Sequence, residues 1–235
     1  MAEMFDVYDE QGNWTGIAER SEVHAKGLWH QTVHCWLVRN ADSVSGEGEE
    51  AGLVAGSGAG KGSDAGVSAK ILFQQRSANK DTNPGCFDIT AAGHIEAGET
   101  PRAVVRELDE ELGVKADFQQ LREYGIIREQ GTGVFGGVRY VDAEISHVYG
   151  LVTSMQLSDF RLQEEEVAGL YEADAEALIS LMEGNVEAIA AQGVELRSGK
   201  LQEAETRVTR SSFVFRDYDY YISVFKFLRE LVQAR

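Results

Sequence analysis

The fold is decided by residues 93–114, which read Gly93-His94-Ile95-Glu96-Ala97-Gly98-Glu99-Thr100-Pro101-Arg102-Ala103-Val104-Val105-Arg106-Glu107-Leu108-Asp109-Glu110-Glu111-Leu112-Gly113-Val114. Thr100 and Pro101 are a typical helix start and Gly113 is a typical helix end, so the stretch predicts a helix over residues 102–112. Within that helix, Glu107, Glu110 and Glu111 are spaced i, i+3 and i+4, which places their carboxylates on one face.

Three like charges on one helix face repel each other unless a cation lies among them. Carboxylate oxygens suit a hard divalent cation such as Mg²⁺ or Mn²⁺, and Arg106 can pair with a neighbouring carboxylate and hold its rotamer. The alternative is a solvated acidic face, the usual outcome for glutamate clusters on surface helices. The helix taken alone favours this alternative, and the residues around it argue against it.

The flanking residues form a longer pattern with the helix. Gly93, Glu99 and the run Arg106-Glu107-Leu108-x-Glu110-Glu111-x-Gly113 resemble the Nudix box of the Nudix hydrolase superfamily, which is a highly specific motif. The family pattern places seven residues between its first Glu and its Arg, whereas six separate Glu99 from Arg106. The spacing from Arg106 onward is intact, but the position of Glu99 is in question, because one helical residue corresponds to a rotation of about 100°.

This resemblance implies a Mg²⁺-dependent enzyme that cleaves a diphosphate linked to another group. Glu107 or Glu111 would orient or deprotonate the attacking water, with Glu144 as the alternative base, and Arg106 would orient a glutamate. The metal ligands that the resemblance implies are the Gly93 carbonyl, Glu107, Glu110, Glu111 and Glu144.

A wider resemblance, over about residues 5–171, is to the isopentenyl-diphosphate isomerase branch of the same superfamily. It rests on stretches such as Pro84–His94 and Arg76-Ser77-x-x-Lys80, and it implies that Arg76 and Lys80 contact the diphosphate. The alternative is that both are solvated side chains after a strand. In the isomerases, residues like His24, His30 and His94 help to hold a structural metal, and Asp142 and Glu144 are the expected partners here. Ordinary core or surface histidines are an equally weighted alternative for His24 and His30.

Two features separate hydrolase from isomerase chemistry. The isomerases carry a catalytic cysteine directly before the Gly-His pair, and this chain has Ala92 at that position. The Arg-Glu-x-x-Glu-Glu run, which the isomerases lose in part, is complete here. Both features favour hydrolysis. Two alternatives stay open: isomerase-like chemistry, and a Nudix fold that binds a ligand without turnover, which only the residue missing before Arg106 supports.

Strand-like and helical runs alternate without a regular βαβ repeat, which predicts an α/β fold of α+β type, an α/β/α sandwich with a mixed sheet. We treat residues 1–235 as a single domain with a flexible loop insertion from Asn40 to Ala69, a stretch with 8 Gly, 6 Ala and 5 Ser and little to bury. The acidic turn 164–166 is expected to be solvated, and the alternative is that one of its glutamates reaches the site as a base. Phe213, Phe215, Tyr218 and Tyr220 are expected to pack in the interior, and stacking on a base of the substrate is the alternative. The expected strands lie at residues 32–38, 70–75, 86–92, 125–129, 138–152 and 167–171. The expected helices lie at residues 102–112, 174–191 and 217–234, and Gly184-Asn185 is a potential break in the second helix.

Composition narrows the partners. The 235 residues include 22 basic and 39 acidic side chains, a net charge of −17, which argues against nucleic acid and anionic membranes. The expected partner is a small-molecule diphosphate whose charge a metal ion offsets. The sequence has no apolar run of ~18 residues and no signal-peptide pattern at its start. Two cysteines cannot build a disulfide framework, so the cytoplasm is the expected compartment, and a homodimer is left open.

Overall fold

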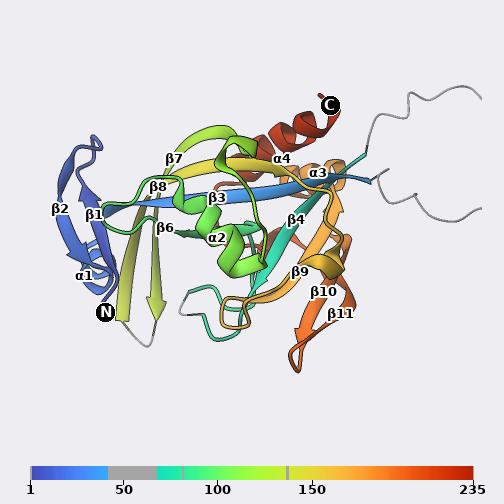
Figure 1. Ribbon diagram of the computed structural model, residues 1–235, viewed down its shortest axis with the longest axis horizontal. Coiled ribbons are helices and arrows are strands. Elements are labelled where there is room, and N and C mark those ends of the chain that lie inside the picture. Colours follow the sequence, from blue (N-terminus) through green and yellow to red (C-terminus); the bar gives the residue numbers. More distant parts are fainter. Residues whose placement is uncertain (1, 42–67, 81, 136–137, 235) are drawn as a thin grey trace, which may run out of the picture.

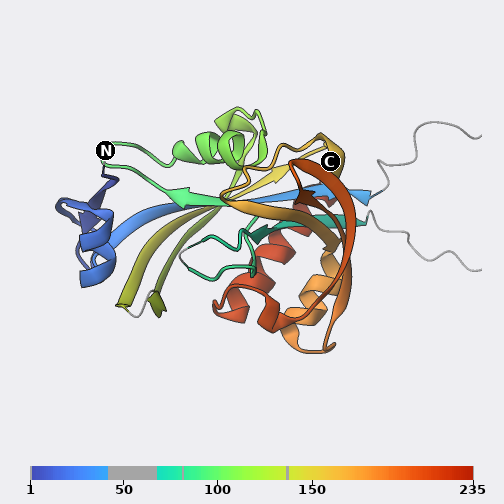
Figure 2. The same cartoon turned by 90° about the horizontal axis from the view of Figure 1, so that it is seen from below.

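A computed structural model describes residues 2–41, 68–80, 82–135 and 138–234. Within these residues, eleven strands form one sheet, and helices lie on both of its faces (Figures 1 and 2). The elements in chain order are β1 (Met4–Tyr8), β2 (Trp14–Glu19), α1 (Arg20–Lys26), β3 (Trp29–Asn40), β4 (Ala69–Arg76), β5 (Phe87–Asp88), β6 (Ala91–His94), α2 (Ala103–Leu112), β7 (Arg122–Phe135), β8 (Val138–Val152), β9 (Val167–Asp174), α3 (Ala175–Glu183), β10 (Ile189–Arg197), β11 (Lys200–Val208) and α4 (Tyr218–Gln233).

The long strand β3 organises the sheet. It pairs antiparallel with β4 and β6 and parallel with β8, and β8 continues into an antiparallel pair with β7. Beyond β4 the sheet runs through β9, β10 and β11, and at the other end of β3 it continues into β1 and β2. A parallel pair inside a largely antiparallel sheet confirms the predicted mixed sheet.

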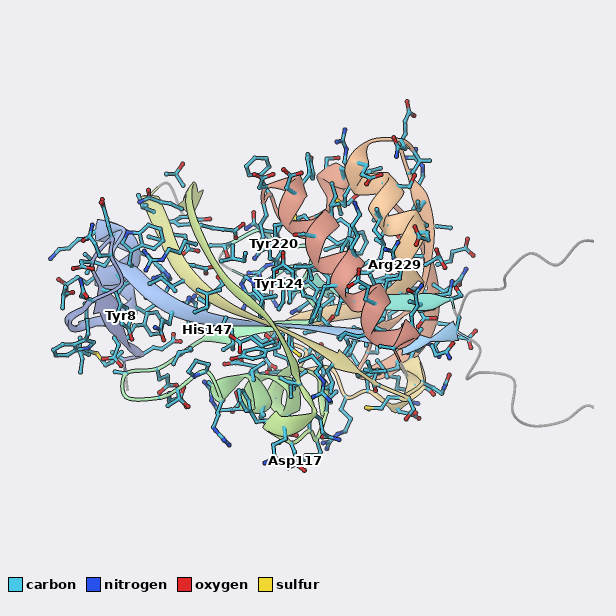
Figure 3. The ribbon with its side chains drawn as sticks, turned by 90° about the horizontal axis from the view of Figure 1, so that it is seen from above. Tyr8, Asp117, Tyr124, His147, Tyr220 and Arg229 are labelled. Atoms are coloured by element: carbon cyan, nitrogen blue, oxygen red, sulfur yellow. The ribbon has the colours of Figure 1, made fainter. Side chains whose placement is uncertain are left out.

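Side-chain alternation along β3 divides the core into two layers. Cys35 and Leu37 belong to the apolar cluster under α2, whereas Trp36 belongs to the cluster under α3 and α4. The Trp36 ring lies 5.2 Å from the ring of Phe225 on α4, and Tyr220 and Tyr124 lie between α4 and the sheet (Figure 3). Figure 2 shows α2 on one face of the sheet and α3 with α4 on the other, which confirms the predicted α/β/α sandwich.

Helix α2 buries Val104, Leu108 and Leu112 against the sheet and ends where predicted, at Gly113. Gly113 has a φ of 69°, a conformation that glycine adopts without strain. The start differs from the prediction. The helix begins at Ala103, and Thr100 contributes its backbone carbonyl to Ala103 at 2.9 Å rather than a side-chain cap.

The potential break near Gly184-Asn185 is confirmed, whereas the predicted continuation of the helix to residue 191 is wrong. Helix α3 ends at Glu183, because Gly184 adopts a φ of 80° and closes the helix. Residues from Ile189 onward form a hairpin with β11, which the sequence analysis did not predict. Its turn is made by Ser198 and Gly199, both with positive φ, as two-residue hairpin turns require.

The other predicted strands are present with changed lengths. The run predicted as one strand over residues 86–92 divides into β5 and β6, and β7 is longer than residues 125–129. Strands β3 and β4 form the predicted hairpin, and their ends meet where Asn40 pairs with Ala69. Most of the predicted insertion, residues 42–67, lies outside the described residues. No helix within the described part of the chain is long and apolar enough to cross a membrane.

Candidate active site

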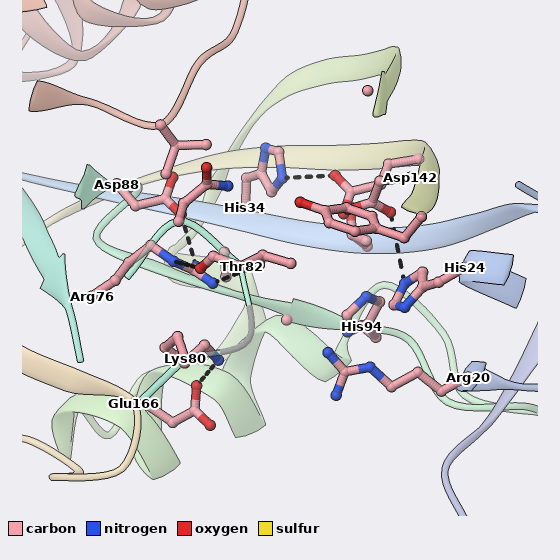
Figure 4. A pocket seen from close by; sticks show the side chains of 18 of the residues that line it. Arg20, His24, His34, Arg76, Lys80, Thr82, Asp88, His94, Asp142 and Glu166 are labelled. Carbon is pink, nitrogen blue, oxygen red and sulfur yellow. Dashed lines mark hydrogen bonds and ion pairs between the residues drawn. The ribbon is translucent and has the colours of Figure 1, made fainter. Parts of the chain in front are cut away.

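An open cleft of about 1580 Å³ lies where α2, the ends of β3 and β6, the β7–β8 arm and the segment Val214–Asp217 meet. Figure 4 shows the cleft with the side chains that project into it. Helix α2 brings three of the predicted ligands, Glu107, Glu110 and Glu111, to one wall, and Gly93 of β6 adjoins them. Arg76, Lys80 and Glu144 line the same cleft.

Glu111 and Glu107 form the buried part of the carboxylate cluster. Glu111 is 5% exposed, and its carboxylate accepts hydrogen bonds from Gln74 Nε2 at 3.2 Å and from the Ala92 backbone at 3.4 Å. Burial, together with the charge of Glu107, raises the pKa of Glu111 well above its usual value. Burial also raises the pKa of Glu107 to about 7, against the opposing attraction of Arg106. A cation bound between these two carboxyl groups would stabilise their ionised forms.

Glycine is required at position 93 because the Glu107 side chain lies very close to its backbone, and not because of its backbone angles. A Cβ atom at this position would stand 2.2–2.5 Å from the carboxylate atoms of Glu107. Any larger residue would therefore displace Glu107, and the absence of a side chain leaves the Gly93 backbone in direct reach of the helix.

Arg106 lies among the carboxylates at the rim of the cluster. Its guanidinium pairs with Glu107 at 3.0 Å, with Glu110 at 3.1 Å and with Glu99 at 3.1 Å. Glu99 therefore still contacts Arg106, although the motif is one residue shorter than the family pattern between these two residues. The turn over residues 100–102 accommodates the shorter spacing. The Glu99 carboxylate also accepts a hydrogen bond from the Glu96 N–H at 3.1 Å, and this contact stabilises the loop before α2.

A second group of possible ligands lies at the other side of the cleft. His24 of α1, His30 of β3 and His94 of β6 place ring nitrogens within 4.8 Å of one another. The Nε2 atoms of His24 and His30 lie 3.7 Å and 3.6 Å from Asp142 Oδ1 of β8. All three Nε2 atoms and Asp142 Oδ1 are buried without a hydrogen-bond partner, and Figure 4 shows His24, His94 and Asp142 converging.

Buried polar atoms without partners are rare because leaving them unpaired is costly. Burial lowers the pKa of His24, of His30 and of His94, so the imidazoles are neutral, the form that binds metal ions. The buried Phe5 ring stacks on two of these histidines, with ring centres 5.4 Å from His30 and 4.6 Å from His94. The donor set fits a divalent transition-metal ion.

Glu144 lies beside the histidine group. Its carboxylate lies within 4.8 Å of ligand atoms of His30 and Asp142. Asp142 and Glu144 therefore share one side of β8, as residues two apart in a strand do. Burial, and then the charge of Asp142, raise the pKa of Glu144 to about 8. His34 Nε2 lies 3.9 Å away, and its other ring nitrogen bonds Tyr220 at 3.1 Å.

The predicted phosphate contacts are both held by acidic partners. Arg76 donates to Asp88 at 3.0 Å and to the Thr82 carbonyl at 3.1 Å, and Lys80 pairs with Glu166. Figure 4 shows both pairs at the cleft wall. Glu166 therefore lies in the cleft, as the alternative for this turn allowed, and it is the partner of Lys80.

Sequence reasoning missed Arg216, which also lines the cleft. Arg216 is 12% exposed and pairs with Asp88 at 2.7 Å and with Glu129 at 3.4 Å. The only signal available in the sequence was a charged residue inside the aromatic run before the last helix. Phe213 and Tyr220 pack in the core as predicted, but Phe215 is 87% exposed, which contradicts its predicted packing.

The electrostatics of the cleft are dominated by acid. Among the described residues, twelve Asp and Glu residues line it against five Arg and Lys residues. Each of the five basic side chains is already in an ion pair with a carboxylate. The cleft can therefore attract a divalent cation strongly, whereas an anion would meet only basic groups that are already paired.

Comparisons with known proteins agree with this arrangement. The NUDIX domain family model matches residues 64–191. An uncharacterised Nudix hydrolase of Clostridium acetobutylicum is 31% identical over 229 residues, which cover 97% of this chain and 98% of that protein. Nudix hydrolase 3 of Arabidopsis thaliana is 32% identical over 173 residues, 72% of this chain but 19% of that protein. The crystal structure of DR0079 from Deinococcus radiodurans is 16% identical, with a TM-score of 0.48, over 77% of this chain and 90% of that one.

The family model covers more than half of the chain, and the bacterial relative matches it almost from end to end. The motif on α2, with its partners Gly93 and Glu99, lies inside the matched region. The chain belongs to the Nudix hydrolase family and is a hydrolase that acts on diphosphate-containing substrates.

Proposed function

We propose that the chain is a Mg²⁺-dependent pyrophosphohydrolase for a small molecule in which a diphosphate is linked to another group, with Mn²⁺ as a substitute ion. The observation that supports this proposal best is the charge of the cleft. Glu107 and Glu111 are buried side by side, and every basic residue that lines the described cleft is already paired. An anionic substrate therefore needs a cation to enter this site.

Glu107, Glu110 and Glu111, with the Gly93 carbonyl, would hold the ion, and Glu144 would be an additional ligand or the base. Bound Mg²⁺ would supply positive charge to the phosphate oxygens. Arg76 and Lys80 would exchange part of their contact with Asp88 and Glu166 for the diphosphate, and Arg106 would keep Glu107 oriented.

Hydrolysis requires a carboxylate that accepts a proton from water as oxygen attacks phosphorus and the P–O–P bond breaks. Glu144 belongs to β8 rather than to the α2 carboxylates, and burial raises its pKa to about 8, which suits a base that acts near the working pH. Glu107 is the second candidate, and a cation bound to it would lower its pKa from the metal-free value. Glu111 is the third candidate, although its deeper burial favours the protonated form. The histidine group with Asp142 is proposed as a second cation site, separate from the α2 carboxylates.

The proposal also includes one domain over the whole chain, cytoplasmic action and no role for nucleic acid or membranes. The net charge of −17 supports the last point.

The test is a phosphate-release assay on a panel of nucleoside and non-nucleoside diphosphates, with Mg²⁺, with Mn²⁺ and with EDTA. We expect metal-dependent turnover of at least one substrate and none with EDTA. Glu111→Gln should abolish turnover, whereas Arg229→Gln, a change on α4 outside the cleft, should not. Binding without release would indicate a ligand-binding Nudix protein, and rearrangement of isopentenyl diphosphate would indicate an isomerase.

A further inference from the structure

The segment Val214–Asp217, between β11 and α4, is fixed to the body of the protein by its backbone and by its polar side chains. The Val214 N–H donates to the Phe87 carbonyl at 2.8 Å, and Tyr221 Oη donates to the Val214 carbonyl at 2.7 Å. Arg216 is anchored on Asp88, and Asp217 caps α4 by accepting from the Asp219 N–H at 3.0 Å. The one side chain of this segment that is left without packing is Phe215.

Phe215 is 87% exposed, although its neighbours Phe213 and Val214 are 4% and 8% exposed. Exposed apolar residues are common on protein surfaces, so exposure alone carries no meaning. The location of Phe215 is informative, because among the described residues that line the cleft it is the only exposed large apolar side chain. A segment that is held by backbone and side-chain hydrogen bonds therefore carries an exposed aromatic ring at the cleft.

Asp88 links this ring to the proposed phosphate contact. One oxygen of the buried Asp88 carboxylate accepts from Arg76 at 3.0 Å, and the other accepts from Arg216 at 2.7 Å. Because Phe215 directly precedes Arg216, a single carboxylate fixes both the arginine proposed to hold the diphosphate and the segment that carries the ring. Glu129 of β7, which lies 3.4 Å from Arg216, also lines the cleft.

We propose that Phe215 is a specificity-determining residue, whose ring contacts the organic group attached to the diphosphate. The inference rests on the proposed function, because it takes Arg76 as the phosphate end of the site. The chemistry shared by suitable groups is an apolar face, which a flat heteroaromatic ring and a short hydrocarbon chain both offer.

Equilibrium binding tests the inference without requiring turnover. The probes, measured by isothermal titration calorimetry with Mg²⁺, are adenosine monophosphate against ribose 5-phosphate, and dimethylallyl monophosphate against methyl phosphate. Each pair differs by the organic group alone. We expect Phe215→Ala to weaken binding of the larger probe in at least one pair by roughly 5- to 150-fold, the range of stacking on aromatic side chains, and to leave the smaller probe unchanged.

Two further variants make the result specific. Phe215→Tyr keeps the ring and should retain binding, whereas Ile126→Ala removes an exposed apolar side chain that lies outside the cleft and should change nothing. Loss in the adenosine pair identifies a flat ring as the group, and loss in the dimethylallyl pair identifies a hydrocarbon chain. If Phe215→Ala leaves both pairs unchanged, or weakens small and large probes equally, the inference is wrong. Absence of hydrolysis with Phe215-dependent binding would refute the proposed hydrolase while leaving this inference standing.

Discussion

Replacing Glu107 by Gln should stabilise the metal-free protein at alkaline pH. The Glu107 carboxyl is 12% exposed, and its pKa is raised from 4.5 to about 7 by burial, even after the attraction of Arg106 is included. At 1.36 kcal/mol for each pKa unit, this difference corresponds to about 3 kcal/mol. Glutamine has nearly the same shape and no charge to bury, and Arg106 keeps its contacts with Glu99 and Glu110.

The sign follows from the direction of the shift. Since the folded-state pKa of Glu107 lies above the unfolded value, folding is favoured by its protonated form below pH 4.5, and this advantage is lost as pH rises through about 7. Wild type in EDTA should therefore lose about 3 kcal/mol between pH 4 and pH 8 through this group. The Glu107→Gln variant should not lose it, so the two proteins should be equally stable at pH 4 and differ most at pH 8.

Thermal unfolding of both proteins in EDTA at pH 4, 6 and 8 measures the effect. For a chain of this length, about 3 kcal/mol corresponds to a difference in Tm of roughly 6–12 °C at pH 8. Glu110→Gln is the matched control, because the Glu110 side chain is 53% exposed and its removal should change Tm little. Saturating Mg²⁺ should reduce or reverse the advantage of the variant. Equal stability at pH 8 in EDTA, or a gain that does not depend on pH, would refute the reasoning.

Three other predictions follow from the same geometry. Gly93→Ala should lower turnover about 100-fold, because the added Cβ would displace the Glu107 carboxylate. Steady-state kinetics would measure this loss, and circular dichroism would verify that the variant is folded. Replacing the Asn40–Ala69 insertion by an Asn-Gly turn should preserve folding and activity, because the strand ends already pair at this point; an inactive or unfolded product would contradict it. Wild type and Ala92→Cys should not convert isopentenyl diphosphate to dimethylallyl diphosphate, since proton addition and removal require two positioned groups; formation of the product by wild type, followed by NMR, would overturn the hydrolase assignment.

The sequence predicts best those features that depend on neighbouring residues. Helix α2 and its carboxylate face follow from side-chain spacing and from Gly113, and α4 from its apolar stripe and the cap Asp217. The error after Gly184 has the same origin, because residues 185–191 are helix-compatible on their own. Their pairing with β11 decides otherwise, and that contact is formed with residues up to 19 positions further along the chain, Ile189 with Val208.

Features that depend on distant contacts were predicted only where a family resemblance supplied them. His24, His30, His94 and Asp142 come from four different elements, and no spacing in the sequence indicates that they converge. Arg216 and Phe215 lay outside the resemblance. Their position is set by the contact of Arg216 with Asp88, which is 128 residues earlier in the chain. A local pattern contains no information about that contact.

The pairing of the basic side chains has a consequence for how an acidic protein binds an acidic substrate. A diphosphate that contacts Arg76 and Lys80 competes with Asp88 and Glu166 for these side chains, and each partial exchange replaces one ion pair by another with little net gain. The favourable free energy must then come from elsewhere in the cleft. A cation among Glu107, Glu110 and Glu111 removes their mutual repulsion and adds positive charge to a cleft lined by twelve acidic and five basic residues. Substrate affinity should therefore rise with Mg²⁺ concentration until the carboxylate site saturates, and Arg76 and Lys80 should contribute orientation more than affinity.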